Sequence, residues 1–227
     1  MAQNIIGTFI YIHAGFGGIA LLSGSVALLT PKGNNLHRKG GLIFFYTMLT
    51  SALMSMIISM LPGHVNYFLF VIGIFSSYMI LTGKRILNLK SLYRGEKPGS
   101  IDFWLARVML VTAIAMAAYG IYLLTCQNNN GVVMIVFGAI GFFMALGDLS
   151  MLAKQQTDKR FWLYKHITKM TGGYIAALTA FFVVNQVLPG LWGWLSPTVA
   201  GSIYITYHQF RFRKKGEGIL AKRNIEY

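Results

Sequence analysis

The chain has 227 residues, of which 55% are hydrophobic and only 11% are charged. A soluble domain carries about 25% charged residues, so this chain cannot cover a globule with polar surface, and lipid is its expected solvent. The net charge of +14 fits either nucleic acid or an anionic membrane surface. The single cysteine, Cys126, excludes an intramolecular disulfide and a CxxC metal site.

Long apolar stretches separated by polar breakers follow one another along the chain. A transmembrane helix needs about 20 mostly apolar residues. The stretches that qualify are 5–30, 41–61, 66–86, 103–126, 131–153, 166–188 and 196–212. Lipid offers the backbone no hydrogen-bond partners, so each stretch is predicted to be helical. The sequence therefore predicts an all-α, polytopic transmembrane helix bundle of about seven spans, forming one domain over residues 1–227.

Lysine and arginine gather in alternate gaps between these stretches. The first, third and fifth gaps with their approaches, and the tail, hold Lys32, Arg38, Lys39, Lys84, Arg85, Lys90, Arg94, Lys97, Lys154, Lys159, Arg160, Lys165, Arg211, Arg213, Lys214, Lys215, Lys222 and Arg223, whereas the other gaps hold none. This positive-inside pattern predicts an odd number of spans, an outer N-terminus and a cytoplasmic C-terminus. The expected partner of the charge is the anionic inner leaflet of the bilayer, not nucleic acid.

Two ionisable residues lie inside the apolar stretches, and such a residue costs about 2.5–3.5 kcal/mol at mid-membrane. Asp148 lies about one turn from the cytoplasmic end of the fifth stretch, and Arg107 lies at a similar depth in the fourth. These stretches are expected to be antiparallel neighbours. The two side chains either pair with each other or reach the interface separately.

Several stretches also carry faces of small or hydroxyl-bearing residues. One stripe is His13, Gly17, Ala20, Gly24 and Ala27, and another is Gly138, Gly141, Ala145 and Asp148. Small residues let helix backbones approach, so these stripes are predicted to face the bundle interior. The hydroxyl face Thr47, Ser51, Ser55 and Ser59 bonds either across helices or back to its own carbonyls.

The histidines divide by depth. His37, His166 and His208 belong to the cytoplasmic side, whereas His13 lies in the outer half of the first stretch. Three histidines and a carboxylate at one depth fit a zinc site with an open position, and two on facing helices fit axial haem ligation. Histidines near helix ends also serve as interfacial or capping residues, and that reading stays open beside zinc and haem.

Several segments together resemble a family of bacterial polytopic membrane proteins classed as a domain of unknown function. The segments are His37-Arg38-Lys39-Gly40-Gly41, His166-Ile167-Thr168-Lys169-Met170, Leu81-Thr82-Gly83-Lys84-Arg85, Gly147-Asp148-Leu149 and the run from Tyr174 to Asn185, with the His13-x-x-x-Gly17 pattern. The resemblance implies a multi-span bundle in the bacterial inner membrane and no particular activity. It singles out His13, His37, Arg38, Arg85, Asp148, His166, Tyr174 and Asn185 as polar positions of interest.

Three functions fit these residues. The first is a binding or redox module, in which a cytoplasmic-side cluster holds a metal, a haem or a small acidic ligand; its members are His37, His166, His208, Asp148 and Arg107. The second is a small-solute or proton-coupled transporter that uses Asp148 and the histidines. The third is an intramembrane metal hydrolase, which needs three metal ligands and a water. The sequence determines neither the function nor the oligomeric state.

Overall fold

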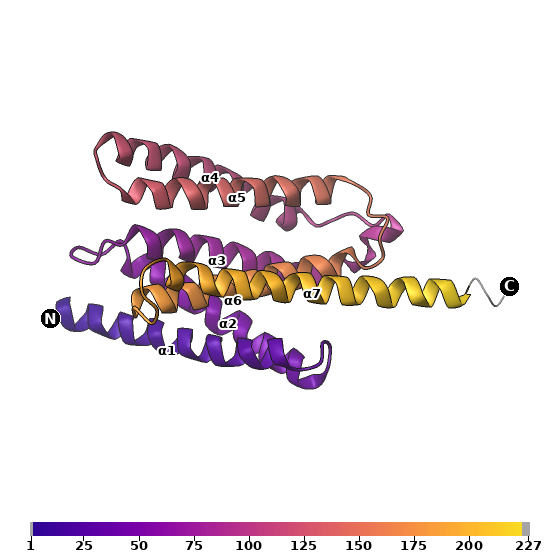
Figure 1. The fold of residues 1–227 in the computed structure, drawn as a ribbon. Helices are drawn as coiled ribbons and strands as arrows, with labels where there is room; N and C mark the ends of the chain where they lie inside the picture. The colour runs from indigo at the N-terminus through magenta and orange to yellow at the C-terminus, as the bar shows by residue number, and fades with distance from the viewer. Residues whose placement is uncertain (1, 224–227) are drawn as a thin grey trace.

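A computed structural model describes the backbone of residues 2–223 and the side chains of residues 6–213. Within this part the chain forms seven α-helices and two short 3₁₀ helices. They are α1 (Ala2–Leu29), α2 (Asn35–Ile58), α3 (Tyr67–Arg85), η1 (Ile86–Asn88), η2 (Lys90–Arg94), α4 (Ser100–Thr125), α5 (Asn130–Ala153), α6 (Phe161–Val184) and α7 (Leu191–Arg223). The α-helices run lengthwise beside one another, and the short loops join them at the two ends of the bundle (Figure 1).

Helices α1 to α6 are each long and apolar enough to cross a membrane. The prediction of an all-α, multi-pass membrane protein is thus confirmed. Helix α7 differs, because Pro197 lies inside it and polar residues become frequent toward its end. It is not among the six apolar candidate spans found in the described part of the chain, although residues 196–212 were expected to form one.

Helix α7 nevertheless runs the length of α6 (Figure 1). Near its start, the Trp194 ring packs on Phe68 of α3 with centroids 4.5 Å apart. Toward its other end, the Phe212 carbonyl accepts a hydrogen bond of 2.7 Å from Arg160, in the loop before α6. The described part of α7 therefore connects opposite ends of the bundle. The side chains of Lys214, Lys215, Lys222 and Arg223 lie outside the described residues.

Capping asparagines fix where two helices begin. The Asn34 side chain accepts from the backbone N–H of His37 at 2.7 Å, so α2 begins well before residue 41, where the apolar stretch starts. Asn66 does the same for Leu69 at the start of α3, at 3.0 Å. Such caps satisfy N–H groups that the first turn of a helix leaves unpaired. As a result, His37 stands in the first turn of α2.

The third gap contains structure that its polar composition does not suggest. Helices η1 and η2 bury Ile86, Leu89 and Leu92 against Leu152 and Phe161. Beside them, the Arg85 guanidinium pairs with Asp102 through bonds of 2.6 and 3.1 Å. Asp102 also accepts from the Gly99 backbone N–H, which closes the first turn of α4. A bidentate pair of this kind is stronger than a single-contact ion pair, and it joins α3 to the start of α4.

Helices α4 and α5 form a hairpin that stands beside the other helices (Figure 1). The hairpin packs on the rest of the protein mainly through α3. Within it the backbones approach closely at the predicted small-residue stripe of α5. A Cβ atom on Gly138 would lie only 2.9 Å from the Ala113 carbonyl oxygen. The prediction that Gly138, Gly141, Ala145 and Asp148 face the interior is confirmed, since all four are buried.

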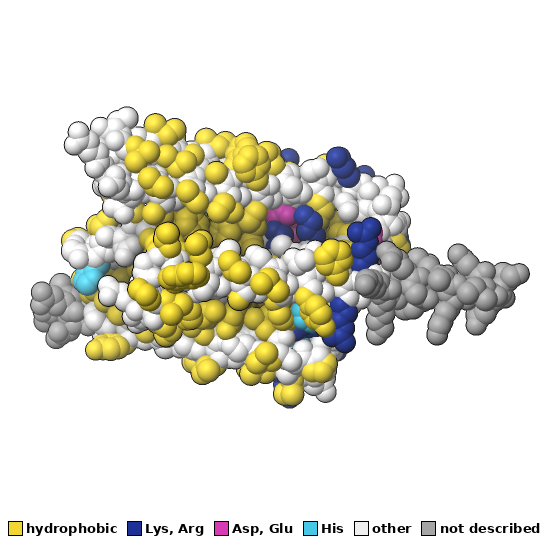
Figure 2. Space-filling view, in the orientation of Figure 1, with side chains coloured by type: hydrophobic (Ala, Val, Ile, Leu, Met, Phe, Trp, Pro, Cys, Tyr) yellow, Lys and Arg dark blue, Asp and Glu magenta, His cyan; other side chains and the backbone are white. Residues whose placement is uncertain are grey.

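The two ends of the bundle differ in charge. We call the end with the α1–α2 loop, η1, η2 and the α5–α6 loop the basic end, because these segments, together with the helix ends and the loop next to them, hold most of the lysine and arginine residues. We call the other end the bare end, because its turns at residues 59–66, 126–129 and 185–190 hold none. Figure 2 shows the dark blue side chains gathered toward one end of the visible face. The alternation of basic and uncharged gaps in the sequence therefore places the basic loops at one end of the bundle and the uncharged turns at the other.

Candidate functional site: a cavity at the bare end

A cavity of ≈ 580 Å³ lies between α1, α2, α3 and α6. Pockets that hold small molecules in proteins have about this size. Its walls are mostly small or apolar, and its hydrogen-bonding side chains are His13, Ser51, Ser55, Ser76, His64, Asn66 and Asn185. None of the described residues that line it is Asp, Glu, Lys or Arg. A charged ligand would therefore find no opposite charge among these residues.

The cavity occupies the bare-end half of the four helices. His64 and Asn66 of the α2–α3 turn and Asn185 after α6 line its mouth. Going inward, the lining residues end at Leu21 of α1, Met48 of α2, Ser76 of α3 and Ala176 of α6. Each of these positions lies near the middle of its helix. The cavity therefore extends from the bare end to the middle of the bundle.

His13 is the polar group whose chemistry in the cavity is best defined. Its Nδ1 atom lies 2.9 Å from the Ser51 carbonyl oxygen, so Nδ1 carries the proton, because a carbonyl only accepts. The Ser51 hydroxyl in turn donates to the His13 carbonyl at 3.1 Å. A neutral His13 ring thus keeps its Nε2 lone pair as an acceptor. These two hydrogen bonds join α1 to α2, so Ser51 of the hydroxyl face bonds across helices, one of the two alternatives given by the sequence.

The rest of that hydroxyl face bonds mainly back to its own helix. Ser55 donates to the Ala52 carbonyl at 2.8 Å and also lies 3.4 Å from the Leu69 carbonyl of α3, and Ser59 donates to the Met56 carbonyl at 2.9 Å. Thr47 bonds to the Ile43 carbonyl in the same way. Of this face, Ser51 and Ser55 line the cavity.

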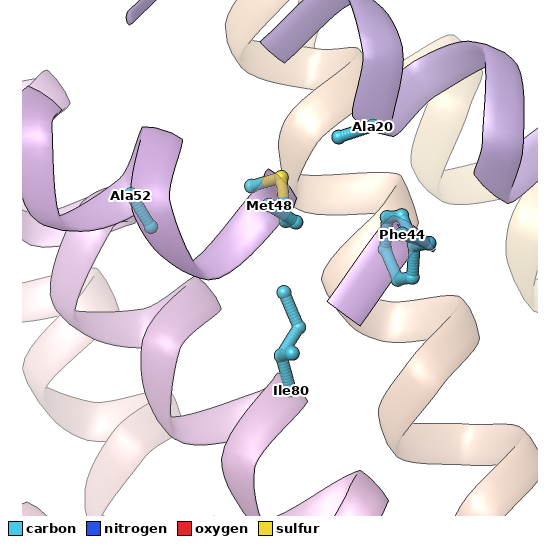
Figure 3. Packing of buried hydrophobic residues seen from close by; sticks show 5 residues of the cluster. All are labelled: Ala20, Phe44, Met48, Ala52 and Ile80. Carbon is cyan, nitrogen blue, oxygen red and sulfur yellow. The ribbon is translucent and has the colours of Figure 1, made fainter. Parts of the chain in front are cut away.

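A layer of apolar side chains closes the inner end of the cavity. It comprises Ala20, Phe44, Met48, Ala52 and Ile80, from α1, α2 and α3, and we call it the plug. Ile80 is 0% exposed, Phe44 3% and Met48 7%. Figure 3 shows Ile80 pointing toward Met48, which lies between Phe44 and Ala52 along α2. Met48 and Ala52 also line the cavity, so the plug forms its floor.

A hydroxyl pair lies next to the plug on the side of the basic end. The Tyr174 hydroxyl of α6 and the Ser25 hydroxyl of α1 are 2.7 Å apart. Because Ser25 donates to the Leu21 carbonyl at 2.8 Å, Tyr174 is the donor of this pair. The Tyr174 ring also packs on Phe44 of the plug. Tyr174, a polar position singled out in the sequence, thus links α1 to α6.

The predicted cytoplasmic-side histidines act as links between helices. The Nδ1 atom of His37 lies 2.9 Å from the Ala27 carbonyl, near the end of α1. That of His166 lies 2.8 Å from the Gly83 carbonyl, near the end of α3. Each ring therefore donates to a carbonyl of a helix's last turns, where carbonyls lack partners in their own helix. Both contacts agree with the alternative in which histidines near helix ends act as capping residues.

His208 lies apart from these contacts, among aromatic rings of α7. Its ring is 4.3 Å from that of Tyr204, between centroids, and 6.1 Å from that of Phe212. Its Nδ1 atom is buried and has no hydrogen-bond partner among the described atoms. The neighbouring Tyr204 hydroxyl donates to the Leu28 carbonyl at 2.8 Å, which ties α7 to α1.

Asp148 pairs with Lys169 and not with Arg107, so of the two alternatives given by the sequence the Asp148–Arg107 pair is wrong, and buried Asp148 does not reach the interface separately either. The Lys169 ammonium lies 2.5 Å from the carboxylate, and both side chains are buried. The Tyr78 hydroxyl donates to the same carboxylate. Arg107 is exposed on α4, its guanidinium 5.8 Å from the Phe103 ring. The reason is geometric, because α4 turns Ala106 and Met109 toward α5 and leaves Arg107 on its outer side.

Three of the positions singled out in the sequence remain, namely Arg85, Arg38 and Asn185. Arg85 forms the ion pair with Asp102 described above, whereas Arg38 is exposed at the basic end. Asn185 ends α6, where its side chain donates to the Phe181 carbonyl at 2.8 Å, and it lines the cavity mouth.

The sequence did not single out Tyr78, Lys169 or Asp102 as residues of a polar site. The apolar run around Tyr78 hides it, and Lys169 and Asp102 fall near span ends, where charges are expected.

The described residues contain no group of three or more His, Cys, Asp and Glu side chains that could hold a metal ion. The three-ligand zinc site and the metal hydrolase that requires it therefore lack their ligand set in this part of the chain. Haem ligation by two histidines is not tested by this observation and stays a prediction.

No protein-family model, curated protein or solved structure matches the chain. The class of protein is therefore assigned from the helices of this chain alone. Six long apolar helices define a multi-pass membrane protein in contact with the lipid bilayer. The resemblance drawn from the histidine segments stays a prediction.

Proposed function

We propose that this membrane protein binds a small, uncharged, largely apolar molecule in the bare-end cavity. The observation that carries the proposal is a ≈ 580 Å³ pocket whose described lining holds no Asp, Glu, Lys or Arg and includes the His13 ring and three serine side chains. Apolar walls with a few placed polar groups are typical of small-molecule sites. A ligand with one hydrogen-bond donor matches the Nε2 acceptor of a neutral His13.

The proposed orientation places the bare end outside and the basic end in the cytoplasm. The charge separation between the two ends supports it. With α7 as a seventh crossing, the C-terminus lies in the cytoplasm, and the ligand enters from the outer side of a bacterial inner membrane. The native Cys126 offers a direct test, because it is exposed and follows α4 at the bare end.

A membrane-impermeant maleimide added to spheroplasts should label Cys126 in the wild-type protein. In a Cys126→Ser background, a Lys97→Cys variant should be labelled only after the membrane is opened, because Lys97 is exposed at the basic end. A green fluorescent protein fused to the C-terminus should fluoresce, since it matures in the cytoplasm. The reverse labelling pattern would contradict the orientation, and a dark fusion would contradict the seventh crossing.

Ligand binding can be tested with alkylphenols and their methyl ethers, which differ in one hydrogen-bond donor. Phenols that fit the cavity should raise the melting temperature of the purified protein, and matched carboxylates and amines should not. Replacing His13 with Leu should weaken phenol binding about tenfold, the effect of one hydrogen bond, and leave the ethers unaffected.

The matched controls distinguish the cavity from the lipid-facing surface. Ala177→Phe places a ring in the cavity and should abolish the phenol effect, whereas Leu22→Phe lies on an exposed face of α1 and should preserve it. Phenol stabilisation that survives Ala177→Phe would place binding elsewhere. If none of the probes stabilises the protein, this ligand class is wrong.

A further inference from the structure

Polar groups continue beyond the plug on the helices that line the cavity. Next to the plug lies the Ser25–Tyr174 hydroxyl pair, and nearer the basic end lie the His37 and His166 contacts. Each of these groups has a hydrogen-bond partner, as a polar group inside an apolar bundle requires. The line from mouth to basic end is thus polar, then apolar at the plug, then polar again.

From this arrangement we propose that the cavity is one half of a translocation path for its ligand, and that the plug is the gate in the middle of that path. The inference rests on the proposed function, because it takes the cavity as the binding site. It adds a movement that opens the same cavity toward the basic end, as in alternating access.

The contacts around the plug identify what would move. Helix α1 packs mainly on α2 and meets α6 over a much shorter seam. The Ser25–Tyr174 hydrogen bond crosses that seam. Gly24 makes room for it, since a Cβ there would lie 2.6 Å from the Tyr174 ring. Separation of α1 from α6 would break this bond. Withdrawing Phe44 and Met48 of α2 from Ile80 also requires α2 to part from α3, on which it packs extensively.

The plug side chains suit such a movement. Met48 has a flexible, unbranched side chain that can repack in more than one arrangement. The neighbouring Met170 of α6, partly buried against the plug, offers the same adaptability. In this scheme the Tyr174 hydroxyl stabilises the closed gate, because its hydrogen bond to Ser25 forms only while α1 and α6 are in contact. Tyr174→Phe removes that one bond and keeps the ring.

The test places a cysteine at Ala177, which lines the cavity and contacts the plug, in a Cys126→Ser background. A charged, membrane-impermeant thiosulfonate is applied to spheroplasts and, separately, to inside-out vesicles. Translocation predicts that Ala177→Cys reacts from both sides. Adding Tyr174→Phe should raise the rate from the inside about 2- to 10-fold, the effect of one hydrogen bond. Lys97→Cys, unreactive in spheroplasts, and the native Cys126 of the wild-type protein, unreactive in inside-out vesicles, show that each membrane preparation is sealed.

The outcomes distinguish the two proposals. Reaction from the outside alone, both with and without the Tyr174→Phe substitution, would overturn the gate and leave the binding site standing. No reaction from the outside would overturn the accessible cavity, and the proposed function with it. Should Tyr174→Phe disturb folding, Ser25→Ala breaks the same bond from α1 and provides the second measurement.

Discussion

Replacing Lys169 with Met is expected to lower the free energy of unfolding by about 3–5 kcal/mol, the usual cost of leaving one member of a buried ion pair alone. The carboxylate of Asp148 would lose its ammonium partner at 2.5 Å and would retain only the Tyr78 hydroxyl. The three residues come from α5, α6 and α3. The substitution should therefore loosen the α4–α5 hairpin from the rest of the bundle, as measured by unfolding in mixed detergent and SDS.

A double-mutant cycle identifies the cause of that loss. Asp148→Asn alone should also destabilise the protein, because it leaves the Lys169 ammonium unpaired. Combined with Lys169→Met it should cost much less than the sum of the two, since no buried charge then remains. Arg107→Met is the control and should change stability little, because Arg107 is exposed. Additive losses, or a large loss for Arg107→Met, would contradict the Lys169 pairing.

The helices and their charged ends could be predicted from the sequence because both follow from the bilayer. An apolar run of about 20 residues has few alternatives to a helix in lipid. The positions of Lys32, Lys90 and Lys159 then mark one end of the bundle. The helix starts were less accurate, because α2 begins at Asn35 through its Asn34 cap, which lies outside the apolar stretch.

The partner of Asp148 could not be predicted, because it depends on how helices pack in three dimensions. Sequence adjacency favours α4 as the neighbour of α5, and α4 does cover the stripe that ends in Asp148. At that point, however, Tyr78 and Lys169 reach the carboxylate from α3 and α6. Lys169 lies near the start of the apolar stretch 166–188 and therefore resembles an interfacial lysine in the sequence, although α6 begins at Phe161.

The cavity escaped prediction for a related reason. Small residues allow close packing where another helix follows them and leave space where none does. On α5, Gly138 meets the α4 backbone. On α1, Gly18 lines the cavity instead, and a Cβ there would meet nothing within 4 Å. His13 was correctly placed in the bare-end half of α1, but its sequence context alone does not show whether its ring meets a cavity or a neighbouring helix.

Gly138→Ala is expected to destabilise the α4–α5 hairpin by about 1–3 kcal/mol, the usual cost of overpacking. The new Cβ would lie 2.9 Å from the Ala113 carbonyl oxygen and 3.0 Å from the Ala117 nitrogen. Both are backbone atoms, so α4 as a whole must move away. Adding Gly120→Ala should increase the loss, because its Cβ would lie 2.8 Å from the Gly131 carbonyl oxygen. The same unfolding assay provides the measurement.

Two other glycines of α5 separate the packing effect from helix propensity. At Gly147 a Cβ would meet nothing within 4 Å, so Gly147→Ala should be neutral or stabilising by up to about 1 kcal/mol, the gain of alanine over glycine in a helix. At Gly141 the atoms in the way belong mainly to the flexible Met109 side chain, which predicts an intermediate effect. If Gly138→Ala and Gly147→Ala change stability equally, the close backbone approach of α4 and α5 is wrong. The ranking Gly138, Gly141, Gly147 follows only if the distance between these two backbones sets the stability of the hairpin.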